Sequence, residues 1–103
     1  MLKVVVLCNR KAGMSREDFA KYWLNIHAAK SKKIHGLRKS TVNLLSPEGG
    51  GEGLYDGIAE LWYDDMDAWR KALESPEGKE SGKDADNFIG KMLVFYAEEY
   101  NII

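Results

Sequence analysis

A shortage of cysteine and of net charge limits what this protein can be. Cys8 is the only cysteine among 103 residues, so no disulfide staples the fold and a reducing, cytoplasmic compartment is expected. Cys8 lies inside an apolar run with no basic group predictably beside it, which favours a small core residue over a nucleophile. The formal net charge is −1 at pH 7, so no overall field attracts nucleic acid or an anionic membrane, and neither is expected as a partner.

Long apolar segments are also missing. No stretch approaches the roughly 18 apolar residues that a membrane-spanning helix needs. The apolar run near residue 1 is too short for a signal peptide and lacks a small-residue cleavage site. Hydrophobic residues make up 45% and charged residues 30% of the chain, a composition that is typical of a folded domain and excludes disorder. The length predicts one domain, 1–103.

Histidine is scarce as well. His27 and His35 are the only two, and no third ligand stands at a suitable spacing, so no metal site is predicted. Basic residues gather in one stretch of the chain, which either holds an anion or forms the solvated end of a helix and its following loop. The members of this basic cluster are Lys30, Lys32, Lys33, Arg38 and Lys39.

What the sequence does contain is a clear alternation of strand and helix patterns. β-branched and aromatic runs predict four strands, over residues 2–9, 37–45, 58–63 and 92–97. Helical spacing predicts two helices and a short extra one, over residues 15–29, 64–75 and 77–88. This order predicts an α+β fold of ferredoxin-like βαββαβ type, in which a four-stranded antiparallel sheet carries its helices on one face. A glycine-rich segment, 46–57, is expected to be a flexible loop.

Local signals place the helix ends. Ser15 followed three residues later by Asp18 resembles a capping box, and Asp64 with Asp67 indicates a second helix start. Pro76 is expected to end or reorient that second helix.

The apolar pattern also predicts self-association. Two helices cover only one face of a sheet, yet the first and last strands are apolar on both faces. Ile102 and Ile103 look exposed, which is unusual for a monomer. An identical subunit, a bound apolar ligand, or both must cover the second face, and a homodimer through the sheet is expected.

Several segments together resemble the EthD family of the dimeric α+β barrel superfamily. The most specific is the YW-x-x-x-HA pattern of Tyr22, Trp23, His27 and Ala28, followed by DG…E-x-W-Y from Asp56 to Tyr63. The resemblance runs from residue 2 to residue 99. It implies two ferredoxin-like units whose sheets join into a barrel, with a pocket between sheet and helices. It further implies a small aromatic, polyketide-like or lactone molecule as the ligand. Related methylmuconolactone methylisomerases and polyketide cyclases need no metal or organic cofactor, so none is expected.

His27 is the first candidate for a catalytic residue. Phe19, Trp23 and Ile26 fall at helical spacing and predict an inward stripe, and His27 continues it near the helix end. A neutral imidazole among aromatic groups can accept a proton near pH 7. The resemblance supports this role, because the corresponding histidine is the proposed base of the isomerase relatives. The alternative is a histidine that only hydrogen-bonds to backbone and terminates the helix.

Glu60 is the second candidate for acid–base work. It shares a strand face with Ile58 and Trp62, so its carboxylate must reach solvent, pair with a base, or carry a raised pKa. An interface ion pair with Arg38 or Lys39 is the alternative.

Five further residues are candidates for binding a substrate. The three large aromatic ones either line a pocket or form plain core, Tyr22 offers a hydroxyl donor, and Asn9 is a weaker candidate. The set is Tyr22, Trp23, Trp62, Tyr63 and Asn9.

The sequence leaves the activity open. Relatives tend to place a tyrosine after the GLRK stretch, whereas this chain has Ser40, which puts the isomerase reaction in doubt but leaves the pocket in place. A cofactor-independent isomerase or cyclase with His27 as base is the leading hypothesis. The alternatives are a non-catalytic ligand-binding or accessory protein of a degradation pathway, and a cofactor-independent monooxygenase.

Overall fold

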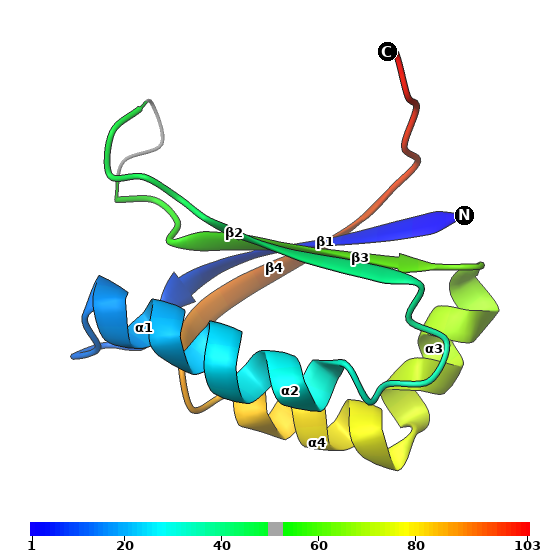
Figure 1. Ribbon diagram of the computed structural model, residues 1–103, viewed down its shortest axis with the longest axis horizontal. Helices are drawn as coiled ribbons and strands as arrows, with labels where there is room; N and C mark the ends of the chain where they lie inside the picture. The colour runs from blue at the N-terminus through cyan, green and yellow to red at the C-terminus, as the bar shows by residue number, and fades with distance from the viewer. Residues whose placement is uncertain (50–52) are drawn as a thin grey trace.

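The four predicted strands form one antiparallel sheet in the order β2-β3-β1-β4. The computed structural model describes residues 1–49 and 53–103, and residues 50–52 of the predicted loop lie outside the described part. The strands are β1 (Leu2–Arg10), β2 (Lys39–Leu44), β3 (Gly57–Tyr63) and β4 (Ile89–Ala97). The helices are α1 (Arg16–Tyr22), the π-helix η1 (Trp23–His27), α2 (Ala28–Ser31), α3 (Met66–Glu74) and α4 (Pro76–Ala85). The predicted α+β, ferredoxin-like fold is confirmed (Figure 1).

The helix starts follow the sequence signals, with one shift. The Ser15 hydroxyl accepts a hydrogen bond from the backbone N–H of Asp18, as predicted. At α3 the cap is Asp65 rather than Asp64: its carboxylate accepts from the N–H of Ala68 at 2.8 Å. Asp64 is occupied elsewhere, because Arg38 donates to both of its carboxylate oxygens.

Pro76 reorients the chain, and the helix after it ends at Ala85, three residues earlier than expected. Ser75 ends α3 and also caps α4, where Pro76 occupies the first turn. A proline in the first turn does not destabilise the helix, because the N–H that it lacks would have no partner within the helix in any case. The two helices pack closely because residue 78 is glycine: a Cβ at Gly78 would lie 1.8 Å from the carbonyl oxygen of Ala72.

The first helical segment contains a π-turn that the sequence did not predict. The backbone N–H of Ala28 bonds to the carbonyl of Trp23, five residues earlier, so the turn holds one residue more than an α-helical turn. Ile26 therefore rotates outward and is exposed, and its predicted place in the inward stripe is wrong. His27 takes that place and packs on Phe88, with 4.9 Å between ring centroids.

The core lies between the sheet and the helices in two clusters. One contains Cys8, Phe19, Trp23 and Phe88, and the other Val4, Tyr63 and Ala72. Cys8 is fully buried and burial raises the pKa of its thiol to about 12, which confirms the core interpretation. The ring of Trp23 packs against β3, where a Cβ at Gly57 would lie 2.3 Å from one of its carbons.

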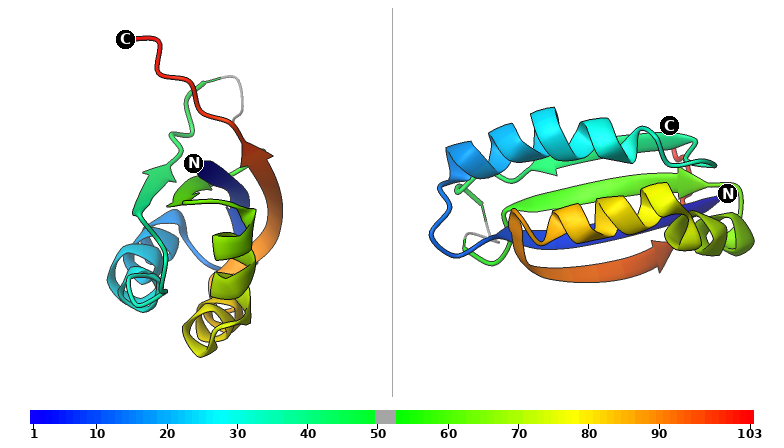
Figure 2. Two further views of the ribbon diagram at one scale, coloured as in Figure 1. Left: turned by 90° about the vertical axis from the view of Figure 1, so that its right-hand side faces the viewer. Right: turned by 90° about the horizontal axis from the view of Figure 1, so that it is seen from below.

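Among residues 1–49 and 53–103, no helix lies on the second face of the sheet (Figure 2). We call it the open face. Strand register places Val5 and Leu7 of β1 there beside Ile58 of β3 and Leu93 and Phe95 of β4. On β4, the two open-face side chains Leu93 and Phe95 are 47% and 48% exposed. The uncovered apolar face that the sequence predicted is therefore present. In the described residues no helix is long and apolar enough to cross a membrane.

Candidate active site

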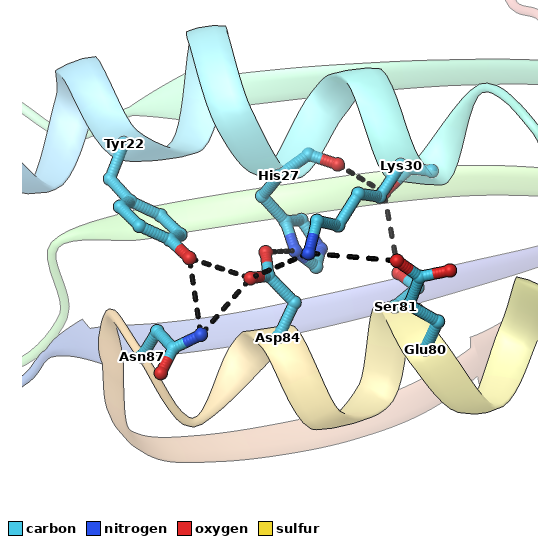
Figure 3. A network of polar contacts seen from close by, with 8 residues as sticks. Tyr22, His27, Lys30, Glu80, Ser81, Asp84 and Asn87 are labelled. Carbon is cyan, nitrogen blue, oxygen red and sulfur yellow. Dashed lines mark hydrogen bonds and ion pairs between the residues drawn. The ribbon is translucent and has the colours of Figure 1, made fainter.

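A histidine–carboxylate pair connects the first helical segment to α4. His27 ends η1, and its Nδ1 lies 2.9 Å from Oδ2 of Asp84 (Figure 3). The two residues are 57 positions apart in the chain, and they meet because α2 packs alongside α4. The His27 ring sits against Phe88, which shields one of its faces.

Asp84 is the centre of a larger polar network. Its side chain is 3% exposed, so its charge needs partners from the protein. The Tyr22 hydroxyl donates to Oδ1 at 2.6 Å and the Asn87 amide to the same oxygen at 3.1 Å. The Lys30 ammonium lies 3.4 Å from Oδ1, and Asn87 also donates to the Tyr22 oxygen at 3.2 Å.

These partners keep Asp84 ionised. Burial acts to raise the pKa of the carboxyl, but the hydrogen bonds from Tyr22, His27 and Asn87 and the nearby Lys30 charge outweigh it and lower the pKa to about 2. The hydrogen bond that the Tyr22 hydroxyl donates to the Asp84 anion, together with burial, raises the pKa of Tyr22. At neutral pH the network therefore holds a fixed negative charge beside a tyrosine that keeps its proton.

The ionised carboxylate decides which nitrogen of His27 carries the proton. An anionic carboxylate can only accept, so the neutral imidazole must donate from Nδ1 and leave Nε2 as the free acceptor. Nε2 has no hydrogen-bond partner among residues 1–49 and 53–103. In that part of the chain every fully buried side-chain nitrogen or oxygen has a partner, so Nε2 is not fully buried. Nε2 is thus reachable from outside. This is the arrangement in which an imidazole acts as a general base.

Two hollows adjoin the network, and Ser31 belongs to the walls of both. The Ser31 hydroxyl donates to the His27 carbonyl at 3.2 Å and lies 3.5 Å from the Ser81 hydroxyl. The smaller hollow, of about 200 Å³, has an almost wholly apolar wall that includes Val6, Leu61, Tyr63, Ala85 and Val94. The larger, of about 350 Å³, lies between α2 and β2 and is lined by residues that include Trp23, Lys32, Ser40, Val42 and Ala59.

The predicted site residues do not all come together. Tyr22 is in the network, Trp23 lines the larger hollow and Tyr63 the smaller. Trp62 faces the open side of the sheet, where the Lys3 and Lys39 ammonium groups lie 5.0 and 4.7 Å from its ring centroid.

Asn9 and Glu60 also lie away from His27. The Asn9 amide donates to the carbonyl of Leu54 at 2.6 Å. Glu60 is on the open face, where Lys3 pairs with it at 2.5 Å. Hydrogen bonds from Lys3, Asn43 and Thr41 outweigh burial and lower the pKa of Glu60. Of the three alternatives for Glu60, the raised pKa is wrong and pairing with a base is found, with Lys3 instead of Arg38 or Lys39.

The basic cluster does not converge on one point. Lys30 joins Asp84, Arg38 pairs with Asp64, and Lys39 covers Trp62. These separate contacts favour the solvated helix end over an anion site. Within the described part of the chain, no three His, Cys, Asp or Glu side chains are grouped closely enough to hold a metal ion.

Asp84 and Asn87 are the site residues that the sequence interpretation missed. Their segment was predicted only as a short polar helix. A signal was available in Ser81, Asp84, Ala85 and Phe88, which stand at positions i, i+3, i+4 and i+7 of one helix face and are all buried. Because three of the four are polar or small, hydrophobicity alone does not reveal that face.

Comparison with known proteins adds a family to this geometry. The model of the EthD domain matches residues 11–92. The crystal structure of an EthD family protein from Bacillus halodurans is 33% identical, with a TM-score of 0.83 over 97% of this chain and 99% of that chain. No curated protein sequence matches.

Two further solved structures share the fold. A dimeric protein of unknown function with a ferredoxin-like fold, from Bacteroides fragilis, is 19% identical, with a TM-score of 0.71 over 95% of both chains. SnoaB from Streptomyces nogalater, a cofactor-independent oxygenase, is 14% identical, with a TM-score of 0.72 over 99% of this chain and 95% of that chain. At these identities the likeness shows the fold alone.

Proposed function

Because the chain belongs to the EthD family, as the sequence resemblance predicted, we propose that it converts a small ring-containing molecule by proton transfer, with His27 as general base. The observation that carries this proposal is the pairing of His27 Nδ1 with the buried, ionised Asp84. The substrate class is the one that the resemblance implies, a small aromatic, polyketide-like or lactone molecule. Proton transfer of this kind needs no cofactor.

The chemistry follows from the free Nε2 atom. Nε2 takes a proton from a carbon next to a carbonyl group, and the electron pair of that C–H bond passes into an enolate. The imidazolium that forms is stabilised by the Asp84 carboxylate 2.9 Å from Nδ1. The imidazolium, whose N–H exchanges with solvent, then gives a proton to the product at another carbon or at oxygen, so an isomerisation or ring closure leaves His27 as it began.

The smaller hollow, which shares Ser31 and Ser81 with the network although His27 itself is not in its wall, offers a place for an apolar ring. Its wall contains Ser31 and Ser81, whose hydroxyls meet beside the His27 carbonyl, and otherwise mainly apolar side chains. A ligand site of this kind, apolar with a few polar groups at one end, orients a small molecule by its polar edge. Its volume of about 200 Å³ favours a single ring over a large polycyclic molecule.

A proton-exchange experiment tests the role of His27. A panel of small lactones and cyclic ketones, whose protons next to the carbonyl exchange slowly in water, is incubated with the protein in D₂O, and loss of that proton is followed by NMR. We expect His27→Gln to slow the exchange at least 100-fold, the lower end of what a general base contributes. The matched control is His35→Gln, which changes the other histidine, and it is expected to stay within twofold of the unchanged protein.

Three outcomes separate the candidate functions. Equal exchange in His27→Gln and His35→Gln would rule out His27 as the base. Binding of a panel member without any exchange would favour the non-catalytic ligand-binding alternative, in which the network only clamps two helices. Oxygen uptake with a quinol-like substrate, measured at an oxygen electrode, would favour the monooxygenase alternative.

We also propose that the protein is a homodimer joined through the open face. The support is the half-exposed apolar surface of β4 together with the absence of any covering helix among the described residues. The relative from Bacteroides fragilis, which shares the fold, is described as dimeric. A sheet face of this kind buries its apolar area most simply against an identical face across a two-fold axis.

A further inference from the structure

The segment that follows β4 is attached firmly at its start. Glu99 lies just beyond the end of β4, and its two carboxylate oxygens have separate partners. The indole N–H of Trp62 donates to Oε1 and the Lys3 ammonium to Oε2, both at 3.1 Å. Trp62 and Lys3 both belong to the open face, so Glu99 ties the start of this segment to the rim of that face.

Beyond Glu99 the chain leaves the body of the molecule. Figure 1 shows it rising from the sheet on the side opposite the helices. Its apolar side chains contact little: Tyr100 is 74% exposed, Ile102 is 89% exposed and Ile103 is fully exposed. The Tyr100 hydroxyl reaches only Glu98, at 3.3 Å. We call residues 100–103 the arm.

An arm of this composition is unfavourable in water on its own. Each isoleucine or tyrosine that remains in water forgoes the free energy that its burial would release. Ordered, extended chain with adjacent exposed apolar residues is typical of a segment that packs on another surface. The arm also has no charged residue, which argues against an anionic membrane surface as its partner, because such surfaces attract basic segments.

We propose that the arm of one copy packs against the second copy across the open face, so that each chain straps its partner. This inference rests on the proposed homodimer. The position of the arm argues for that occupant: it starts at the rim of the open face and projects on the side where a second copy would lie. The Glu99 contacts hold the start of the arm at the rim of the open face.

Removal of the arm gives the first test. A chain that ends at Glu99 retains the anchor and all strands, so it is expected to fold normally by circular dichroism. We expect its dimer dissociation constant, measured by sedimentation equilibrium, to rise at least tenfold. The double variant Ile102→Asp, Ile103→Asp is expected to behave in the same way, and Leu24→Asp, on the exposed side of η1, is expected to leave the constant unchanged.

A photo-crosslink gives the second test. A benzophenone amino acid replaces Tyr100 in a chain that carries an affinity tag, and this chain is mixed with an untagged chain. The proposal predicts crosslinks between the tagged and the untagged chain, at residues that mass spectrometry then identifies.

The outcomes distinguish this inference from the proposed dimer. If the full chain is a dimer and removal of the arm changes its dissociation constant less than twofold, the arm proposal is overturned and the dimer stands. If the full chain sediments as a monomer at 100 times the protein concentration used for activity, both are overturned. Crosslinks confined to a single chain would also overturn the arm proposal.

Discussion

Asp84 shows how one side chain can set the properties of several others. It holds the Nδ1 proton of His27, accepts from Tyr22 and Asn87, and is buried almost completely. A carboxylate in such a place is stable only while all its donors remain. His27 and Tyr22 could be found from helical spacing and family resemblance. Asp84 was missed because most of the residues that share its buried helix face are small or polar, and that face does not look hydrophobic in the sequence.

The lowered pKa of Asp84 predicts a specific loss of stability in acid. The folded pKa of about 2 lies below the unfolded value, so this stabilisation is complete above about pH 4 and is lost as pH falls towards 2. The shift corresponds to about 2 kcal/mol. We expect the difference in unfolding free energy between the unchanged protein and Asp84→Asn, from urea titrations, to shrink by about that amount between pH 5 and pH 2.

The unchanged protein and Asp84→Asn share all the other carboxylates. The contribution of those carboxylates therefore cancels when one unfolding free energy is subtracted from the other. Asp67→Asn, a change on the exposed side of α3, is the matched control, and its difference from the unchanged protein should stay constant over the same range. A constant difference for Asp84→Asn as well would contradict the structural account of the network.

At the scale of elements, the π-turn η1 is what allows Trp23 and His27 to serve different layers. Trp23 packs on β3 while His27, four residues later, meets α4. The order of strands and helices could be predicted from periodicity, because long apolar runs are easily recognised in the sequence. The π-turn could not, because an extra residue in one turn changes no hydrophobic pattern until the partners on both sides are known. The buried face of α4 was hidden for a related reason, since Ser81 and Asp84 read as solvent-facing residues.

The contact of Trp23 with Gly57 gives a prediction at this scale. A methyl group at residue 57 would overlap the indole, at 2.3 Å from one ring carbon, and the ring must move away from β3. We expect Gly57→Ala to lower the unfolding free energy by about 1–3 kcal/mol, measured by urea denaturation followed through tryptophan fluorescence.

Gly82 offers a matched control for that substitution. A Cβ at Gly82 meets nothing within 4 Å, and the residue lies inside α4, where alanine is favoured over glycine by up to about 1 kcal/mol. Gly82→Ala should therefore leave the stability unchanged or raise it. A loss of stability as large as that for Gly57→Ala would mean that the Trp23 contact is not the cause.

At the scale of the whole molecule, the helices of the described residues all lie on one side of the sheet, and the other side carries half-exposed apolar residues such as Leu93 and Phe95. The presence of that uncovered face could be predicted from strands without a polar side. The charged rim around it could not, because Lys3, Glu60 and Glu99 come from three separate segments and meet only in the folded sheet.

A charge placed on the apolar part of the open face is expected to separate the proposed dimer. Phe95 faces that side on β4, in register with Val5. An aspartate there would lose its water on association, and central interface residues of this kind cost about 2 kcal/mol or more when replaced. Phe95→Asp should raise the dimer dissociation constant at least 30-fold in sedimentation equilibrium, whereas Leu24→Asp should not. Unchanged association of Phe95→Asp would place the dimer contact elsewhere.

The sealed position of Cys8 has a practical consequence for all of these measurements. With a thiol pKa of about 12 and no exposed surface, Cys8 is almost never a thiolate at pH 7.5, and maleimide reagents react only with the thiolate. A cysteine introduced at a surface position, with an ordinary pKa of about 8.5, is about a tenth ionised at that pH. A single fluorophore or spin label can therefore be attached at residue 100 or on α4 in the otherwise natural sequence. Distances within and between copies then become measurable without first replacing a core residue.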